Sequence, residues 1–250
     1  MPSQSRHASA RRNEQPVSSI GSLNESDLHA ALKRYSAPPG SQFEVELGGY
    51  VIDALHDDLL IEVQTRNFGA MRTKLAALLP EHRVRLVLPV AAKRWLVKHH
   101  DDGRLERRRS PRSAGAEQVF SELVYGAELF AHPNLEIELV FIEEEEHRRH
   151  VPGKAWRRRG WVVTGRGLVE VQKKRLLREP HDLLTLLPSG LPTPFTTADL
   201  AQLGKWQRRL AQQAAYCLLA LDLVRRVGKV GNAYQYELVA LTQTPPATPH

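Results

Sequence analysis

Several features are scarce in this sequence of 250 residues. A single cysteine, Cys217, excludes a disulfide framework and a cysteine-based zinc site, and it fits a reducing, cytoplasmic setting. No apolar run approaches the ~20 residues of a membrane-spanning helix, so we expect a soluble protein with no membrane partner. Residues 1–20 also lack the apolar stretch of a secretory signal.

Charge, in contrast, is plentiful and unevenly signed. Lys and Arg number 35 against 28 Asp and Glu, which gives a net charge of +7. A hydrophobic content of 42% is ordinary for a globular protein and excludes global disorder. The positive balance favours a polyanion as partner.

Composition changes along the chain and indicates how it is organised. The N-terminal residues are rich in Ser and Arg without apolar periodicity, residues 148–178 are strongly basic, and a Pro-rich segment begins at 188. We therefore divide the chain into a disordered basic tail (1–21), an α/β domain (22–145), a basic connector with a hairpin turning at 165–167 (146–180), a compact C-terminal domain (181–242) and a second tail (243–250).

Hydrophobic spacing predicts the elements of residues 22–145. Leu28 and Leu32 are spaced as on a helix, and residues 43–47 alternate apolar and polar side chains before a Gly48-Gly49 turn. We expect strands over 43–47, 50–55 and 59–65, a helix over 68–78, an apolar central strand over 83–90, an exposed loop over 98–113, a helix over 117–130, and a strand over 135–142 that ends in a solvated EEEEHRRH segment.

Three carboxylates come together if the first hairpins are read literally. With a two-residue turn at Gly48-Gly49, Glu44 lies opposite Asp53, and a similar turn before the third strand places Asp53 opposite Glu62. Cross-strand partners share one sheet face about 4.5–5.5 Å apart, and Gln64 follows on that face. Such acids raise one another's pKa unless a cation neutralises them, and Mg²⁺ prefers oxygen ligands.

Residues 44–75 resemble the active-site region of the PD-(D/E)XK, or restriction-endonuclease-like, nucleases. In that family a hairpin carries an aspartate and the next strand carries (D/E)-x-K. Asp53 matches the first acid and Glu62 the second, while Gln64 stands where the family usually has lysine. Several branches have Gln there, and Lys74 on the following helix could supply the displaced positive charge. The predicted order of elements over 25–90 also resembles the family core.

The resemblance implies a restriction-endonuclease-like mixed sheet flanked by helices, and it implies roles for these residues. Gln64 or Lys74 would position the attacking water or the scissile phosphate, and Glu25 on the preceding helix offers a further carboxylate. Acids on an exposed sheet face are more often simply solvated, and this alternative stays open. The implied ligands of Mg²⁺ or Mn²⁺ are Asp53, Glu62, Glu44 and the Val63 carbonyl.

The C-terminal domain reads as two helices and a two-stranded wing. Thr196 and Asp199 form a capping pair for a short helix, a second helix covers 205–221, and strands over 223–227 and 234–239 follow. This order resembles the winged-helix DNA-binding fold, a small α+β domain. Winged helices also serve as protein-contact modules, so that role stays open. The expected nucleic-acid contacts here are Arg208 and Arg209 on the helix, and Arg225, Arg226 and Lys229 on the wing.

The connector adds a basic patch with sequence-independent attraction to phosphates. Tryptophans at 95, 156, 161 and 206 are either core or stacking residues, and the sequence does not separate these roles. The connector residues expected at nucleic acid are Arg157, Arg158, Arg159, Lys173 and Lys174.

Three hypotheses about function follow. The first is a Mg²⁺-dependent nuclease acting on DNA, in which a homodimer would cut both strands. The second is a DNA-binding or regulatory protein whose nuclease-like fold has lost its chemistry, as the Gln64 substitution suggests. The third is an accessory module that uses the winged helix for protein contacts. Divalent-ion binding separates the first from the others, and salt-sensitive nucleic-acid affinity separates the second from the third.

Overall fold

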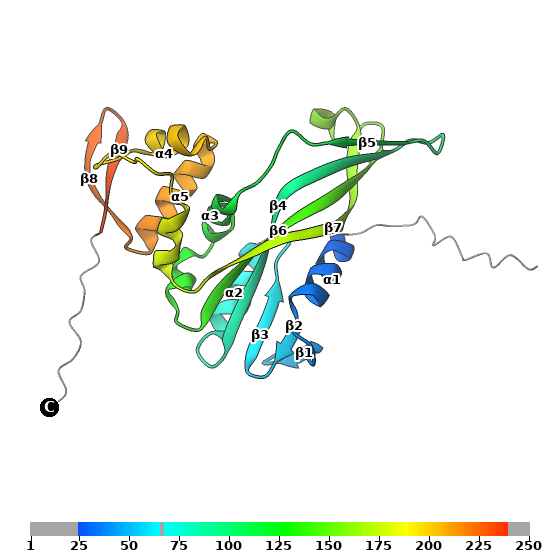
Figure 1. Ribbon diagram of the computed structural model, residues 1–250, viewed down its shortest axis with the longest axis horizontal. Helices are drawn as coiled ribbons and strands as arrows, with labels where there is room; N and C mark the ends of the chain where they lie inside the picture. Colours follow the sequence, from blue (N-terminus) through cyan, green and yellow to red (C-terminus); the bar gives the residue numbers. More distant parts are fainter. Residues whose placement is uncertain (1–24, 66–67, 240–250) are drawn as a thin grey trace, which may run out of the picture.

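The computed structural model describes residues 25–65 and 68–239, and it has a mixed α/β fold in which helices flank a large mixed sheet (Figure 1). Seven strands form this sheet in the order β1-β2-β3-β4-β6-β7, with β5 paired to β4. The predicted tails lie outside the described residues. The strands are β1 (Gln42–Leu47), β2 (Tyr50–His56), β3 (Leu59–Val63), β4 (Arg83–His99), β5 (Leu105–Arg109), β6 (Leu135–His150) and β7 (Trp161–Leu177).

Helices lie on both sides of this sheet and in a C-terminal unit, which we define as residues 180–239. Among the described helices, none is long and apolar enough to cross a membrane. The α-helices are α1 (Glu25–Ser36), α2 (Phe68–Leu78), α3 (Val119–Leu123), α4 (Thr197–Gly204) and α5 (Arg208–Ala220), and the 3-10 helices are η1 (Ala116–Gln118), η2 (Ala127–Ala131), η3 (Trp156–Arg158) and η4 (Pro180–Leu186).

The first two hairpins have the predicted register. Leu47 pairs with Tyr50, and His56 pairs with Leu59. Both residues of the Gly48-Gly49 turn have a positive φ (58° and 79°), which this type of two-residue turn requires and which glycine adopts without strain. The turn therefore sets which residues of β1, β2 and β3 lie opposite one another.

Strand β4 is central, as its apolar sequence predicts. It runs parallel to β3 on one side and to β6 on the other, and both faces of these strands are buried. Leu28 and Leu32 of α1 pack with Val63 and Val87 on one face. On the other face, Leu86 belongs to a larger apolar core to which α2, α3 and α5 also contribute.

Three strands extend past this core and form an arm with β5, which we define as residues 92–110 and 143–167 (Figure 1). The register of β4 against β6 shifts between Ala91 and Lys93, and the register of β6 against β7 shifts twice between Phe141 and Glu144. Such bulges bend a strand and increase its twist. The arm thus begins where the apolar core ends and the strands bend.

The arm corrects three predictions. The expected loop over 98–113 contains the end of β4 and β5, the expected hairpin turn at 165–167 lies inside the continuous strand β7, and the EEEEHRRH segment is paired on both sides within β6. These predictions were wrong because β5 and the end of β6 lack apolar alternation, and because the two glycines inside β7 resemble a turn. The expected helix over 117–130 is likewise divided into η1, α3 and η2.

Ion pairs replace apolar packing in the arm, where three of four consecutive glutamates are buried. Most of their partners come from β4 and β5, whereas Arg148 lies on β6 itself. The predicted solvated strand end is therefore wrong. The pairs are Glu143 with Lys93 (2.8 Å) and with Trp95 Nε1 (2.5 Å), Glu144 with Arg94 (2.5 Å), Glu145 with Arg107 (2.7 Å) and Glu146 with Arg148 (2.5 Å).

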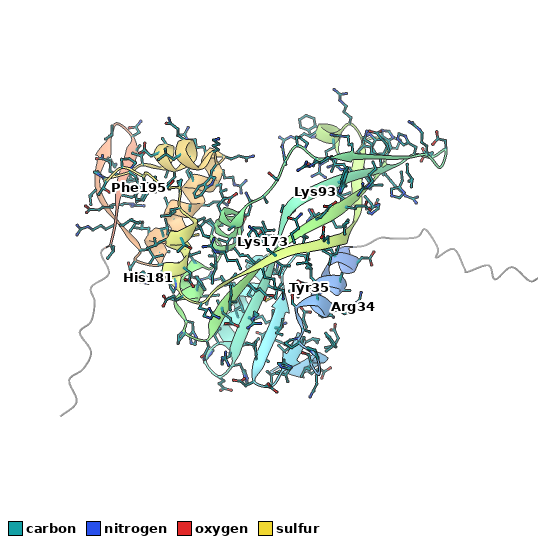
Figure 2. The ribbon with its side chains drawn as sticks, in the orientation of Figure 1. Arg34, Tyr35, Lys93, Lys173, His181 and Phe195 are labelled. Atoms are coloured by element: carbon teal, nitrogen blue, oxygen red, sulfur yellow. The ribbon has the colours of Figure 1, made fainter. Side chains whose placement is uncertain are left out.

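The C-terminal unit follows its prediction closely. Thr196 and Asp199 form a capping box at the start of α4, and β8 (Val224–Val230) and β9 (Ala233–Leu238) form the wing. The helix stripe around Cys217 is buried in the larger core, where the Cys217 Sγ lies 3.7 Å from the Phe120 carbonyl oxygen. Figure 2 shows Phe195 in this unit, away from Lys93 on the arm. The boundaries of the two predicted domains stay a prediction.

Candidate functional site

Asp53 and Glu62 lie side by side on neighbouring antiparallel strands. The register of β2 and β3 places them opposite each other, and the Asp53 backbone N–H donates to Glu62 Oε1 at 3.3 Å. The Asp53 carboxylate in turn accepts a 2.8 Å hydrogen bond from the Val63 N–H. Glu62 is only 1% exposed. The structure thus brings together the two acids that the sequence predicts.

Lys74 joins this pair from α2. Its Nζ lies 2.5 Å from Glu62 Oε1 and donates to the Val51 carbonyl oxygen at 2.6 Å. Because α2 directly follows β3 and packs on that face of the sheet, its second turn brings the lysine to the buried carboxylate. Lys74 therefore places a positive charge beside Glu62, as the sequence predicts.

His29 on α1 is a site residue that the sequence analysis missed. Its Nε2 lies 3.1 Å from Asp53 Oδ2. A signal was available, because His29 follows Leu28 on the buried stripe of the helix that precedes the hairpin. The residue predicted from that helix was Glu25, as a further carboxylate of the site. The Glu25 side chain lies outside what the structure describes.

The two acids have opposite pKa shifts. Burial opposes ionisation of Asp53, but hydrogen bonds from His29 and the Val63 N–H outweigh it, so its pKa is below the usual range. The hydrogen bond to Asp53 raises the pKa of His29 against the effect of burial. Burial and the Asp53 charge raise the pKa of Glu62, although Lys74 acts in the other direction. The site therefore holds a firmly ionised acid beside one that resists ionisation.

Glu44 does not join these acids, and its prediction as a metal ligand is wrong for this structure. It stands opposite Asp53 by register, but its φ is 53°, which interrupts the regular strand at this point. Its side chain is 59% exposed and pairs with Lys33 of α1. Among residues 25–65 and 68–239, no group of three or more His, Cys, Asp or Glu is arranged to hold a metal ion.

Gln64 lines a cavity rather than contacting Glu62. Its backbone N–H donates to the Val87 carbonyl oxygen at 2.9 Å, which extends the β3–β4 pairing by one residue. The cavity has a volume of about 180 Å³ and is also lined by Arg94, Glu122 and Arg166. Burial raises the pKa of Glu122.

A groove of about 850 Å³ shares residues with this cavity, including Arg94 and Glu122. We define the groove by the segment 111–114, α3 and the start of α5. Arg112, Lys205 and Arg209 line it, so it carries excess positive charge toward the C-terminal unit. Among the residues predicted to contact nucleic acid, the groove takes in Arg209.

The other predicted nucleic-acid contacts lie on separate surfaces. Some are already engaged within the protein, since Lys174 pairs with Glu138 (3.2 Å) and Arg225 pairs with Glu237 (2.7 Å). Figure 2 shows Lys173 on β7, where its Nζ lies 4.7 Å from the Phe141 ring centroid. All ten predicted positions are exposed: Arg157, Arg158 and Arg159 between β6 and β7, Lys173 and Lys174 on β7, Arg208 and Arg209 at the start of α5, and Arg225, Arg226 and Lys229 on β8.

Comparison with known proteins finds similarity without an assigned activity. Residues 26–178, from α1 to the end of β7, match a family described as a domain of unknown function (DUF8091). An uncharacterized protein of Treponema pallidum (strain Nichols) is 34% identical over 211 residues, covering 84% of this chain and 81% of that protein. That share of the chain exceeds residues 1–178, so the similarity reaches into the segment after β7. No solved structure matches.

Proposed function

The chain belongs to the DUF8091 family, and we propose that it is a Mg²⁺-dependent nuclease that hydrolyses phosphodiester bonds in DNA. The observation that carries this proposal is the placement of Asp53, Glu62 and Lys74 together at the end of β3. Two adjacent acids and a lysine are the side chains that the resemblance to PD-(D/E)XK nucleases requires. The basic groove, which reaches Gly69 on the same helix as Lys74, supports a polyanionic substrate.

The arrangement of elements supports the finer assignment of fold. The order α1-β1-β2-β3-α2-β4, with antiparallel β1–β3 followed by parallel β3 and β4, matches what we expect of a restriction-endonuclease-like core. In the C-terminal unit, Phe195 forms a bridge with Tyr236 of β9 ahead of α4 and α5. A short strand before two helices and a wing is consistent with a winged helix.

The donor set at the site fits a hard divalent cation. Asp53, Glu62 and the Val63 carbonyl offer oxygen atoms, and Mg²⁺ in proteins is held by one or two carboxylates together with water and substrate phosphate. Glu44 is not needed for such a set. When bound there, the ion supplies a water of lowered pKa and stabilises charge that develops on the phosphate.

The protein's own residues prepare this site. His29 holds the Asp53 carboxylate ionised and oriented, and the Val63 N–H fixes the same carboxylate from the other strand. Lys74 orients Glu62 and places a positive charge where the phosphate would lie. Gln64 faces the cavity that opens into the basic groove. The substrate would therefore approach from the groove.

The proposal is tested by incubating wild type and Asp53→Ala/Glu62→Ala with single- and double-stranded DNA in Mg²⁺, Mn²⁺ or EDTA. We expect cleavage that needs a metal and is absent from the double variant. Glu146→Gln on the arm is the matched control, because it also removes a buried carboxylate, and it should cleave as wild type does. Absence of cleavage by the wild type in every metal would overturn the proposal.

A second candidate is a DNA-binding protein of the same fold without catalysis. The specific observation in its favour is that both acids already have a cationic partner, His29 for Asp53 and Lys74 for Glu62. In that case DNA binding would be salt-sensitive, would not change with EDTA, and would be equal in wild type and the Asp53→Ala/Glu62→Ala variant.

A further inference from the structure

The segment that joins β6 to β7, residues 151–160, carries the most exposed large apolar side chain that the structure describes. We call this segment the tip. Trp156 in the tip is 80% exposed. In Figure 1 the tip lies beside β5 at the far end of the molecule from β1. Such exposure leaves most of the indole without packing, so the side chain contributes little to the stability of the fold.

The tip is nevertheless a well-defined structure. Backbone hydrogen bonds close it at Val151–Gly160 (2.8 Å), Arg158–Ala155 (2.7 Å) and Arg159–Trp156 (3.0 Å). Ala155 and Arg159, on either side of η3, both have left-handed backbones, with φ of 49° and 51°. Non-glycine residues adopt this conformation only where the surrounding structure imposes it. The backbone that carries Trp156 is therefore held in place.

A second tryptophan anchors the base of the tip and shows what a packed indole looks like here. Trp161 meets the rings of His100 and His150 at centroid distances of 5.2 and 5.6 Å, and the Lys98 Nζ lies 4.8 Å from its centroid. Trp156 has none of these ring neighbours. Among the described residues, the cation that lies over its ring is the Arg157 guanidinium, 5.0 Å from the ring centroid.

Positive charge surrounds Trp156. Lys154, Arg157, Arg158 and Arg159 are all exposed, and within the described residues none of them forms an ion pair with a carboxylate. Four unneutralised cations around one exposed aromatic ring match a ligand that has both phosphates and flat bases. A membrane surface fits less well, because interfacial insertion needs a broader apolar face than one indole.

We propose that the tip binds unpaired nucleic acid, with the Trp156 indole stacked on a base and the neighbouring arginines on the flanking phosphates. Bases inside a duplex have their faces covered by their neighbours, so an indole at the surface can stack only on an unpaired or terminal base. The inference rests on the proposed function for the choice of nucleic acid as partner. It adds that the substrate contains a single-stranded segment, contacted at the end of the arm.

The test compares two oligonucleotides of equal length and charge in EDTA: oligothymidylate, and its abasic counterpart, which keeps the phosphates and lacks the bases. Fluorescence anisotropy gives the affinity for each. We expect wild type to bind oligothymidylate about tenfold more tightly, the scale of one stacked base. Trp156→Ala should abolish this preference, and Trp156→Phe should retain most of it.

Matched variants separate stacking from charge and from folding. Phe43→Ala also removes an exposed aromatic side chain, on β1, and should keep the full preference. Arg157→Ala/Arg158→Ala/Arg159→Ala should weaken binding of both oligonucleotides equally and reduce the dependence on salt. Equal affinity of wild type for both oligonucleotides, or a preference unchanged in Trp156→Ala, would overturn the inference. Trp156-dependent sedimentation with anionic vesicles without any oligonucleotide preference would also overturn it.

The outcome is distinguishable from failure of the proposed nuclease. Asp53→Ala/Glu62→Ala leaves the tip unchanged and should keep the base preference whether or not the wild type cleaves DNA. A Trp156-dependent preference for the oligonucleotide with bases, without any cleavage, would support the inference and overturn the nuclease proposal. Cleavage without this preference would support the nuclease proposal and overturn the inference.

Discussion

The buried carboxylates of the arm and those of the candidate site are both paired with cations, yet their surroundings differ. Hydrogen bonds from Lys93 and Trp95 lower the pKa of Glu143. Burial opposes ionisation of Glu146, but Arg148 and its neighbouring arginines outweigh it and lower its pKa. Glu62, in contrast, has a raised pKa, because it is buried and lies beside Asp53.

This difference separates a structural use of buried charge from one suited to chemistry. In the arm, cations pair with Glu143 and Glu146, and the ionised forms of these two acids are stabilised. At the site, two acids share the region between β2 and β3, and one resists ionisation. Perturbed carboxyl groups of this kind concentrate at functional sites, although structural networks also produce them. The following variants test whether this comparison holds.

The largest expected effect is on catalysis at the site. Glu62→Gln keeps the shape of the side chain but removes its charge, so we expect cleavage to fall at least ~10²-fold, the scale for one preorganised electrostatic group. The initial rate of metal-dependent DNA cleavage measures this. Glu146→Gln serves as the control in the arm. Equal losses in the two variants would break the distinction between the regions.

The next effect concerns Lys74. Lys74→Ala leaves Glu62 buried without its cation, which raises the pKa of Glu62 further and should move the rise of the pH–rate profile to higher pH. We expect a rate loss of roughly 10²-fold near neutral pH. Arg72→Ala removes another cation of α2, one that pairs with Glu128, and should leave the profile unchanged. In the Lys74→Ala background, Gln64→Lys should restore part of the rate if position 64 keeps its role.

A smaller effect is expected on stability, where the arm variant should lose more than the site variant. Glu146→Gln removes a buried charge that pairs with Arg148 and Arg94, so we expect a loss of about 1–3 kcal/mol, or roughly 2–10 °C in Tm. Glu62→Gln should cost less than Glu146→Gln, because the raised pKa of Glu62 means that folding favours its ionised form less. Urea unfolding measures both values. A larger loss for Glu62→Gln would show that Glu62 serves the fold.

The smallest effect is the pH dependence of the His29–Asp53 pair. The raised pKa of His29 means that its contribution is full below the pKa of unfolded histidine and is lost as pH rises through the folded value. The lowered pKa of Asp53 means that its contribution is lost only in acid. Compared with His29→Asn, wild type should gain roughly 0.5 kcal/mol near pH 5.5 and almost nothing near pH 8.5.

Urea unfolding of both proteins at the two pH values measures this difference. A gain that is larger near pH 8.5 would mean that neutral His29 is the form that binds Asp53. His82→Asn is a suitable control, because no bond from its side chain to a carboxylate is present among the described residues.

Local sequence was sufficient where local geometry decides the structure. The Gly48-Gly49 turn and the alternation of β1 and β2 predict the register that places Asp53 opposite Glu62. Helical spacing likewise predicts α2, and hence a lysine within one helix length of the acids. The capping pair of α4 was predictable for the same reason, since Thr196 contacts groups only three residues away.

Long-range contacts explain what the sequence did not reveal. The arm strands are held by pairs such as Arg94 with Glu144 and Trp95 with Glu143, whose members lie 50 and 48 residues apart, so no local pattern marks them as strands. His29 was missed because its partner depends on which face of the sheet α1 covers. Glu44 does not lie with Asp53 and Glu62, because its own left-handed backbone interrupts an otherwise regular strand.

The rate at which the buried cysteine reacts with a thiol reagent can measure how often the molecule opens. Cys217 is the single thiol of the sequence, it lies in the core shared by α3 and α5, and burial raises its pKa to about 12. A thiol reagent can modify it only when the C-terminal unit separates from the sheet or the whole chain unfolds. The labelling rate of the unaltered protein therefore reports how often that contact breaks, and DNA that bridges both parts should slow it.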